Sequence, residues 1–228
     1  MKTMMDVLNE TTTANYPQDR GVEALTVNRI LIPFYNQFGM TRVACTDKVN
    51  QCKDIDCIVN GKPYQEKSGT FYSRNNPKLL VEVYNNILAT GETDGKYGWG
   101  LITEASKHIY GYRGTSDKES INPSHIYVGI YESSAIKKIC WEAVNTPEFE
   151  EMVNSFAEKL KNGFSIVKSV HLGNCKLPTV GEVEVWSNAS EKDKITGIKY
   201  AVTISIPMKN FKGEKEIYKL INNKFRKL

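Results

Sequence analysis

A two-residue turn signal, Asn60-Gly61, constrains the fold of this chain more than any other stretch of its sequence. On either side of it lie two short runs with strand character, Ile55–Val59 and Pro63–Lys67. Asn-Gly between two such runs is typical of a β-hairpin, because the tightest hairpin turns need positive φ at both central residues. The sequence therefore predicts two antiparallel strands joined at Asn60-Gly61.

Polar residues recur at matching positions of these two predicted strands. Side chains two residues apart on a strand point to the same face. Asp54 therefore shares a face with Asp56, and Gln65 shares a face with Lys67. One interpretation is that all four are solvent-facing residues of a surface hairpin, and the other is that they belong to a site. The hairpin alone leaves both interpretations open.

A further carboxylate lies on the next apolar run. Leu79–Val83 has the pattern of a buried strand and carries Glu82, and a carboxylate among apolar residues is costly without a partner. Mg²⁺ prefers carboxylate oxygens together with substrate phosphate and water, and metal-assisted phosphodiester hydrolysis uses such an ion. We therefore expect Asp56 and Glu82 to hold a divalent cation, with Lys67 stabilising the negative charge that develops on the phosphate.

Other residues near this stretch are candidates for nucleic-acid contacts. Arg74 and Lys78 accompany a polar loop and are suited to phosphate, and Trp99, between two glycines, is suited to stacking on a base. Surface charge, and for Trp99 a role in covering the core, are the alternative interpretations. The basic segment 209–228 is likewise either a solvated tail or a surface that contacts phosphate.

Composition is that of an ordinary soluble globular protein. Of the 228 residues, 40% are hydrophobic and 25% are charged, and the net charge of +4 does not by itself indicate a nucleic-acid partner. No apolar run approaches the roughly 20 residues that span a bilayer, and the polar N-terminus predicts no secretory signal. We therefore expect a cytoplasmic protein with no membrane partner. The five cysteines match no zinc motif and are expected to be reduced.

Hydrophobic periodicity predicts a mixed α/β chain. Helical spacing is found over residues 19–38, 102–108, 133–144 and 147–160. Strand-like runs before residue 160 are found over 40–46, 55–59, 63–67, 79–83, 109–112 and 125–131. Later strand-like runs, with a terminal helix, are found over 165–171, 180–186, 197–206 and 217–221. The predicted organisation is a loosely ordered segment over 1–19, an α/β core over 20–160 and a β-rich extension with a basic tail over 161–228.

The segment DIDCIVNGKPYQEK resembles the second and third motifs of the PD-(D/E)XK nuclease superfamily. This resemblance implies that Asp56 is the metal-binding aspartate and Lys67 the catalytic lysine. The family's acid two residues before that lysine falls on Gln65, so the chain is similar to the Q-x-K variant of Mrr-like members. An amide oxygen is a weaker ligand, and the resemblance implies a compensating carboxylate. We favour Glu82, whereas a β-bulge would favour Glu66.

The resemblance covers roughly residues 20–112 and includes Glu23, which matches the glutamate of the family's first helix. A looser pattern that includes Gly98-Trp99 is similar to small phage-encoded members, and so implies a bacterial or phage-infected host cell. The implied fold is restriction-endonuclease-like, with a mixed central sheet flanked by helices and a β-rich C-terminal part. The implied cofactor is Mg²⁺, with Mn²⁺ as a substitute. DNA is the expected partner, and RNA and a homodimeric assembly stay open as alternatives.

Three functions follow as hypotheses. The first is a Mg²⁺-dependent deoxyribonuclease that uses Asp56, Gln65, Lys67 and Glu82. The second is a nucleic-acid-binding or assembly protein that keeps the fold without catalysis, which the glutamine at the acid position favours. The third is a site-specific restriction endonuclease whose C-terminal strands read the target sequence.

Overall fold

The structure is a computed structural model that describes residues 24–70, 78–89, 92–94, 101, 103–113, 126–162, 169–193 and 197–228. The chain forms two compact units. Unit 1 combines three segments, residues 1–78, 103–134 and 213–228, and unit 2 combines residues 79–102 and 135–212. The predicted boundary at residue 160 therefore lies inside unit 2. The two units are treated separately below.

Unit 1 is built on a seven-stranded sheet with the order β1-β2-β3-β6-β7-β11-β12. The strands are β1 (Arg42–Ala44), β2 (Cys57–Val59), β3 (Lys62–Thr70), β6 (Lys107–Arg113), β7 (Tyr127–Glu132), β11 (Lys215–Ile221) and β12 (Lys224–Lys227). The β3–β6 pair is parallel and the other pairs are antiparallel. A mixed sheet in an α/β chain was expected, and the structure confirms that coarse prediction.

The hairpin predicted from Asn60-Gly61 is confirmed. Strands β2 and β3 pair in antiparallel register with Val59 opposite Lys62. Asn60 has φ +48° and Gly61 has φ +78°, the left-handed conformations that a two-residue hairpin turn requires. The turn fixes which residues of β3 lie on each face of the sheet.

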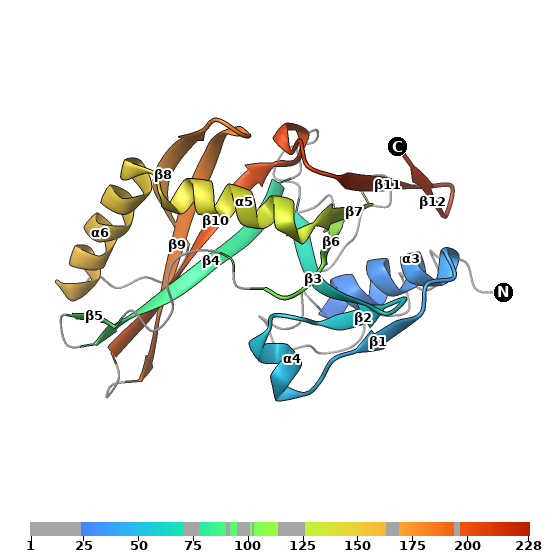
Figure 1. Ribbon diagram of the computed structural model, residues 1–228, viewed down its shortest axis with the longest axis horizontal. Coiled ribbons are helices and arrows are strands. Elements are labelled where there is room, and N and C mark those ends of the chain that lie inside the picture. The colour runs from blue at the N-terminus through green and yellow to red at the C-terminus, as the bar shows by residue number, and fades with distance from the viewer. Residues whose placement is uncertain are drawn as a thin grey trace. The chain divides into compact units, whose positions relative to one another are not determined.

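One face of this sheet is covered by a helical segment, which Figure 1 shows in blue. It consists of a π-helical turn (Val27–Leu31) followed by α3 (Ile32–Gln37), and it ends at Gly39, which has φ +62°. Its apolar residues are buried against the sheet in one cluster, which contains Ile30, Leu31, Phe34, Tyr35, Cys57, Val59, Ile109, Val128 and Phe225. Burial of this apolar surface is the main favourable contribution to the folding of unit 1.

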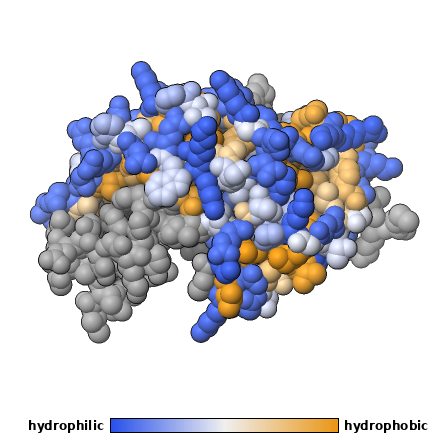
Figure 2. All heavy atoms as spheres, viewed as in Figure 1, coloured by the Kyte–Doolittle hydropathy of each residue, from blue (hydrophilic) through white to orange (hydrophobic). Residues whose placement is uncertain are grey.

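Unit 2 is built on a five-stranded sheet with the order β5-β4-β10-β9-β8. The strands are β4 (Lys78–Ala89), β5 (Glu92–Asp94), β8 (Val170–Leu177), β9 (Gly181–Asp193) and β10 (Gly197–Pro207). Helix α6 (Pro147–Lys161) packs against β8, and Figure 2 shows hydrophilic residues over its outer surface. Thr146 caps its N-terminus, because Thr146 Oγ1 accepts a hydrogen bond of 3.2 Å from the N–H of Phe149.

Two predicted helices are wrong. Residues 103–106 are not helical, and the chain enters β6 at Lys107. The C-terminal stretch forms the hairpin β11–β12 instead of a helix, with a turn at Asn222-Asn223, where both residues have positive φ. The prediction of α5 (Ser133–Val144) is confirmed to the residue. No helix among the described residues is long and apolar enough to cross a bilayer.

Candidate functional site

Asp56 directly precedes β2 (Cys57–Val59), at the end of the pairing between β2 and β3. Its N–H donates to the carbonyl of Tyr64 at 3.0 Å, and its own carbonyl accepts from the N–H of Cys45 at 2.9 Å. Its carboxylate oxygen Oδ2 accepts a hydrogen bond of 2.7 Å from the N–H of Glu66. Main-chain and side-chain bonds together hold the Asp56 carboxylate against the main chain of β3, at the residue between Gln65 and Lys67.

Strand alternation places Gln65 and Lys67 on the face opposite to the side chain of Glu66. The Gln65 side chain is 1% exposed, and neither Oε1 nor Nε2 has a hydrogen-bond partner among the described residues. Lys67 is half-buried, and its ammonium forms no ion pair with any described residue. Among the described residues, this face of β3 thus carries a buried amide without a hydrogen-bond partner and a lysine without an ion pair.

Glu66 projects to the face covered by α3, where its carboxylate is fully engaged. Arg42 donates from Nε to Oε1 at 2.8 Å and from Nη2 to Oε2 at 2.6 Å, and the Tyr35 hydroxyl donates to Oε1 at 3.0 Å. The Glu66 side chain is 3% exposed and that of Arg42 is 19% exposed. The geometry therefore gives no support to Glu66 as a metal ligand through its carboxylate.

The buried ion pair changes the proton affinity of its neighbours. The hydrogen bonds that Arg42 donates to Glu66 raise the pKa of the Arg42 guanidinium. Burial, and then the negative charge of Glu66, raises the pKa of the Tyr35 hydroxyl and of the Cys57 thiol. The guanidinium stays charged and the other two groups stay protonated, so Glu66 is compensated at all ordinary pH values.

The main-chain N–H and carbonyl of Glu66 point to the edge of β3 at which Asp56 lies, and not to the face on which the Glu66 side chain lies. In an antiparallel pair the N–H and C=O of one residue point to the same edge of the strand. Because the Glu66 N–H points to the Asp56 carboxylate, its carbonyl oxygen points to the same edge. The site therefore gathers oxygen atoms from Asp56 and from the main chain of β3.

These residues fit a magnesium ion that keeps part of its water shell. No group of three or more His, Cys, Asp or Glu side chains suited to a metal occurs among the described residues. Mg²⁺, however, is commonly held by one or two carboxylates with substrate phosphate and water. Asp56, the Glu66 carbonyl and the Gln65 amide oxygen supply hard oxygen donors of the kind that this ion prefers.

The other predicted site residues lie on β4 or outside the described residues. Glu82 is exposed on β4, in unit 2. Lys78 is half-buried at the start of the same strand. Glu23, Arg74 and Trp99 lie outside the described residues. The prediction that a second carboxylate joins Asp56 at the metal stays a prediction.

Arg42 and Tyr35 are contributors that the sequence reasoning missed. Each is far from Glu66 along the chain, by 24 residues for Arg42 and 31 for Tyr35. The one available signal in the sequence was Glu66 itself. A glutamate within a buried strand requires a cationic partner, so its presence indicated that one exists. Arg42 lies on β1, which β2 separates from β3 in the sheet, so spacing along the chain did not indicate it.

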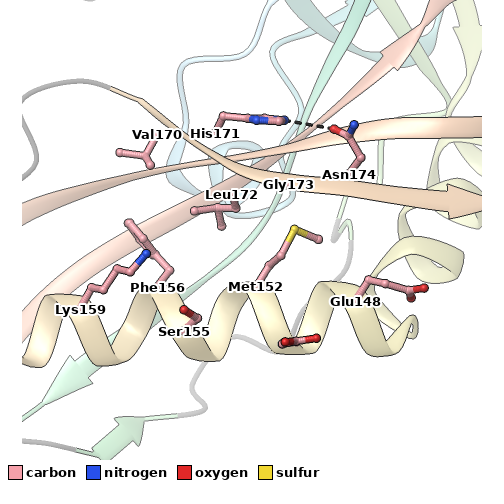
Figure 3. Close-up of a pocket in the computed structure, with 11 residues that line it drawn as sticks. Glu148, Met152, Ser155, Phe156, Lys159, Val170, His171, Leu172, Gly173 and Asn174 are labelled. Atoms are coloured by element: carbon pink, nitrogen blue, oxygen red, sulfur yellow. Dashed lines mark hydrogen bonds between the residues drawn. The ribbon is translucent and has the colours of Figure 1, made fainter.

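A cavity of about 390 Å³ lies in unit 2 between α6 and β8 (Figure 3). His171 and Asn174 project from β8, with 3.1 Å between His171 Nε2 and Asn174 Oδ1. Met152 and Phe156 line the helix side. None of the predicted site residues belongs to it, so this cavity is separate from the site at Asp56.

Comparisons with models of known protein families, with curated protein sequences and with solved structures found no match to this chain.

Proposed function

We propose that the protein is a Mg²⁺-dependent deoxyribonuclease that hydrolyses phosphodiester bonds at a site formed by Asp56, Gln65 and Lys67. One observation carries the proposal. A glutamine buried to 1% exposure has no partner for its amide among the described residues. It lies on β3 beside an anchored carboxylate and on the same face as Lys67, which forms no ion pair with the residues that the structure describes.

An unsatisfied buried amide is costly for a folded protein. Leaving a buried donor or acceptor without a partner costs about 1–3 kcal/mol, and native structures contain few such groups. An apolar residue of similar shape would avoid this cost at position 65. A glutamine there is therefore explained best by a ligand that its amide oxygen contacts, and a divalent cation is a ligand that the Asp56 carboxylate can bind as well.

Each side chain has a role that its surroundings favour. Asp56, the Glu66 carbonyl and Gln65 would hold Mg²⁺, which supplies charge neutralisation at the phosphate and an activated water. The N–H of Glu66 keeps the Asp56 carboxylate oriented before any ligand arrives. Lys67, as a compact positive charge with three donors, stabilises the negative charge that develops on the phosphate oxygens.

The order of the elements in unit 1 supports a restriction-endonuclease-like fold. A helix comes first, then β1 and the short helix α4 (Lys48–Cys52), then Asp56 and the β2–β3 hairpin with its Q-x-K residues, and then β6 parallel to β3. Apart from α4, this is the order that the resemblance to the PD-(D/E)XK superfamily implies. We infer that unit 1 is a member of that superfamily in which Gln65 replaces the second acid.

A binding protein without catalytic activity is the second candidate. It is favoured by the chemistry at β3, where Asp56 contributes one carboxylate and Glu66 is neutralised by Arg42. An amide and a single carboxylate bind metal more weakly than two carboxylates. On this alternative the site would contact nucleic acid through Lys67 and cleave nothing.

The test is cleavage of linear, supercoiled, single-stranded and branched DNA, and of RNA, with Mg²⁺, with Mn²⁺ and without metal. We expect metal-dependent cleavage of DNA by the wild type. Lys67→Ala and Asp56→Asn should each lower the rate at least about a hundredfold. The asparagine retains an acceptor for the Glu66 N–H. Lys62→Ala is the matched control, because Lys62 is an exposed lysine on the same strand.

Three results decide between the candidates. Cleavage that survives both Asp56→Asn and Lys67→Ala would exclude this site. Binding to DNA without cleavage under any metal condition would select the binding protein. Discrete fragments from a duplex of mixed sequence would indicate a site-specific enzyme, whereas a continuous distribution would indicate cleavage without sequence preference.

A further inference from the structure

The turn that leads into Asp56 adopts a conformation that its residues disfavour. Helix α4 (Lys48–Cys52) ends where the carbonyl of Asn50 accepts from the N–H groups of both Lys53 and Ile55, each at 3.0 Å. Asp54, between them, has φ +57°. This is the left-handed helix end that glycine usually provides, and a residue with a Cβ adopts it at an energetic cost. Contacts from elsewhere must therefore hold the turn.

Those contacts come from the segment 103–106, far along the chain. The Thr103 hydroxyl donates to the carbonyl of Asp54 at 3.1 Å and accepts from the N–H of Ala105 at 3.0 Å. The N–H of Glu104 donates to the carbonyl of Lys53 at 2.9 Å. Thr103 is 1% exposed. Two consecutive carbonyls of the turn, those of Lys53 and Asp54, thus accept hydrogen bonds from this segment.

The other end of the segment is attached to the hairpin that carries Gln65. The N–H of Ser106 donates to the carbonyl of Pro63 at 2.8 Å, and the Ser106 hydroxyl contacts the same carbonyl at 3.0 Å. The next residue, Lys107, begins β6 in parallel register with Tyr64 on β3. The segment 103–106 therefore connects the turn before Asp56 with the strand that carries Gln65 and Lys67.

We propose that Thr103 is a positioning residue for the Asp56 carboxylate. Its hydroxyl holds the carbonyl of Asp54, and Asp56 follows two residues later with its carboxylate directed at the Glu66 N–H. Loss of that hydroxyl removes a bond from the strained turn, and the carboxylate is then no longer fixed in advance of the metal. This inference rests on the proposed function, because it assigns Thr103 a part in metal binding by Asp56.

The test uses three variants of the full chain. Thr103→Val keeps the shape of the side chain and removes the hydroxyl, whereas Thr103→Ser keeps the hydroxyl. Thr179→Val is the control for loss of a threonine hydroxyl elsewhere, because Thr179 Oγ1 donates to Glu142 in unit 2. For each protein we would measure thermal unfolding, the Mg²⁺ concentration that gives half-maximal cleavage, and Mn²⁺ binding by electron paramagnetic resonance.

The metal requirement distinguishes positioning from stability. For Thr103→Val we expect the half-maximal Mg²⁺ concentration and the Mn²⁺ dissociation constant to rise about tenfold, as for other residues that orient metal ligands. Thr103→Ser should stay within about threefold of the wild type, and Thr179→Val should not change either value. Equal metal dependence of Thr103→Val and Thr179→Val in folded protein would overturn the inference.

A fourth variant keeps the test valid if Thr103→Val folds poorly. Asp54→Gly removes the cost of positive φ at the turn. Combined with Thr103→Val, it should restore folding and leave the metal requirement raised, because the hydroxyl that holds the carbonyl of residue 54 is still absent. Restored folding together with the wild-type metal requirement would also overturn the positioning role. A wild type that neither cleaves DNA nor binds Mn²⁺ would instead exclude the proposed function, and the inference with it.

Discussion

Oδ2 of Asp56 accepts a 2.7 Å hydrogen bond from the main-chain N–H of Glu66, whose own carboxylate is held on the other face of the strand by Arg42. Glu66 thus connects two environments: a buried ion pair that stabilises unit 1, and a carboxylate oriented beside Gln65 and Lys67. Changes on either side of β3 should therefore have separable effects, one on stability and one on metal-dependent cleavage.

Gln65→Met should stabilise the protein and inactivate it. Methionine has nearly the same length and leaves no buried amide without a partner, so the free energy of unfolding should rise by about 1 kcal/mol or more. Metal-dependent cleavage should be lost because the thioether is a poor ligand for Mg²⁺. Urea unfolding and the DNA cleavage assay measure the two effects.

A second glutamine of unit 1 provides the control for this experiment. The Gln37 amide donates to the carbonyl of Phe225 and accepts from its N–H, both at 2.7 Å. Gln37→Met should therefore lower stability and leave cleavage by the folded fraction unchanged. A Gln65→Met protein that is less stable than the wild type would contradict the account of an unsatisfied amide.

Arg42→Met should be one of the more destabilising single changes in unit 1. It leaves the buried Glu66 carboxylate with the Tyr35 hydroxyl as its hydrogen-bond donor and no compensating charge. Breaking a buried ion pair from one side typically costs about 3–5 kcal/mol. Because Arg42 is partly exposed, we expect the lower end of that range, measured by denaturant unfolding.

The double variant Arg42→Met/Glu66→Met should recover part of the loss, because it removes both charges together. The exposed pair Lys227–Glu216, at 3.5 Å, is the comparison. Lys227→Met should cost no more than about 1 kcal/mol. A double variant less stable than Arg42→Met would show that the ion pair is not the source of the effect.

Gly111→Ala should destabilise unit 1 mainly through its contact with Thr26, because the next atoms, on Leu31 and Ile30, would lie 3.3 and 3.4 Å from the added Cβ. A Cβ at position 111 would lie 2.5 Å from Cγ2 of Thr26, in the helical segment packed on the sheet. Overpacking of this kind typically costs about 1–3 kcal/mol. Thr26→Ser removes the conflicting methyl group and keeps the hydroxyl, so the double variant should be more stable than Gly111→Ala alone.

Alkaline pH should unfold the protein cooperatively. Burial raises the pKa of Tyr35, Tyr112 and Tyr131 above the ordinary value of 10.0. The contribution of each tyrosine to the free energy of unfolding is therefore fully present below pH 10. It is lost as the pH rises further, because the tyrosine ionises at lower pH in the unfolded chain than in the folded protein. Above pH 10, each tyrosine that stays protonated in the folded state lowers the free energy of unfolding by about 1.4 kcal/mol per pH unit.

Absorbance at 295 nm and circular dichroism, followed together from about pH 8 to 12, check this prediction. The ionisation of these tyrosines should coincide with the loss of secondary structure. Tyr112→Phe, which removes one phenol of the 3.2 Å Tyr112–Tyr131 pair, should reduce the dependence of stability on pH. Gradual tyrosine ionisation in a protein that remains folded would contradict it.

Local signals explain what the sequence could predict about the fold. Asn60-Gly61 specifies a turn with its own two residues, and Thr146 with Pro147 marks the start of α6 in the same way. The pairing of β11 with β7 has no such signal, because it joins residues that are more than 80 positions apart. Strand partners are chosen by packing across the sheet, which a single sequence does not display.

The candidate site, like the fold, could be predicted from the sequence only in part. Strand alternation was enough to predict that Gln65 and Lys67 share a face and that Glu66 does not. The engagement of Glu66 by Arg42 could not be predicted from spacing, since the two residues meet only after β1, β2 and β3 pair. The support of Asp54 by Thr103 depends in turn on the path of the chain into β6.

The order in which the chain is synthesised has a consequence for this arrangement. Strand β11 pairs with β7, yet the whole segment 135–212 of unit 2 lies between them along the chain. During translation the edge of β7 that pairs with β11 therefore stays unpaired until residues 135–212 have been made. An unprotected strand edge invites pairing with other chains. Newly made unit 1 should thus be most prone to aggregation during that interval, and dependent on chaperones until β11 arrives.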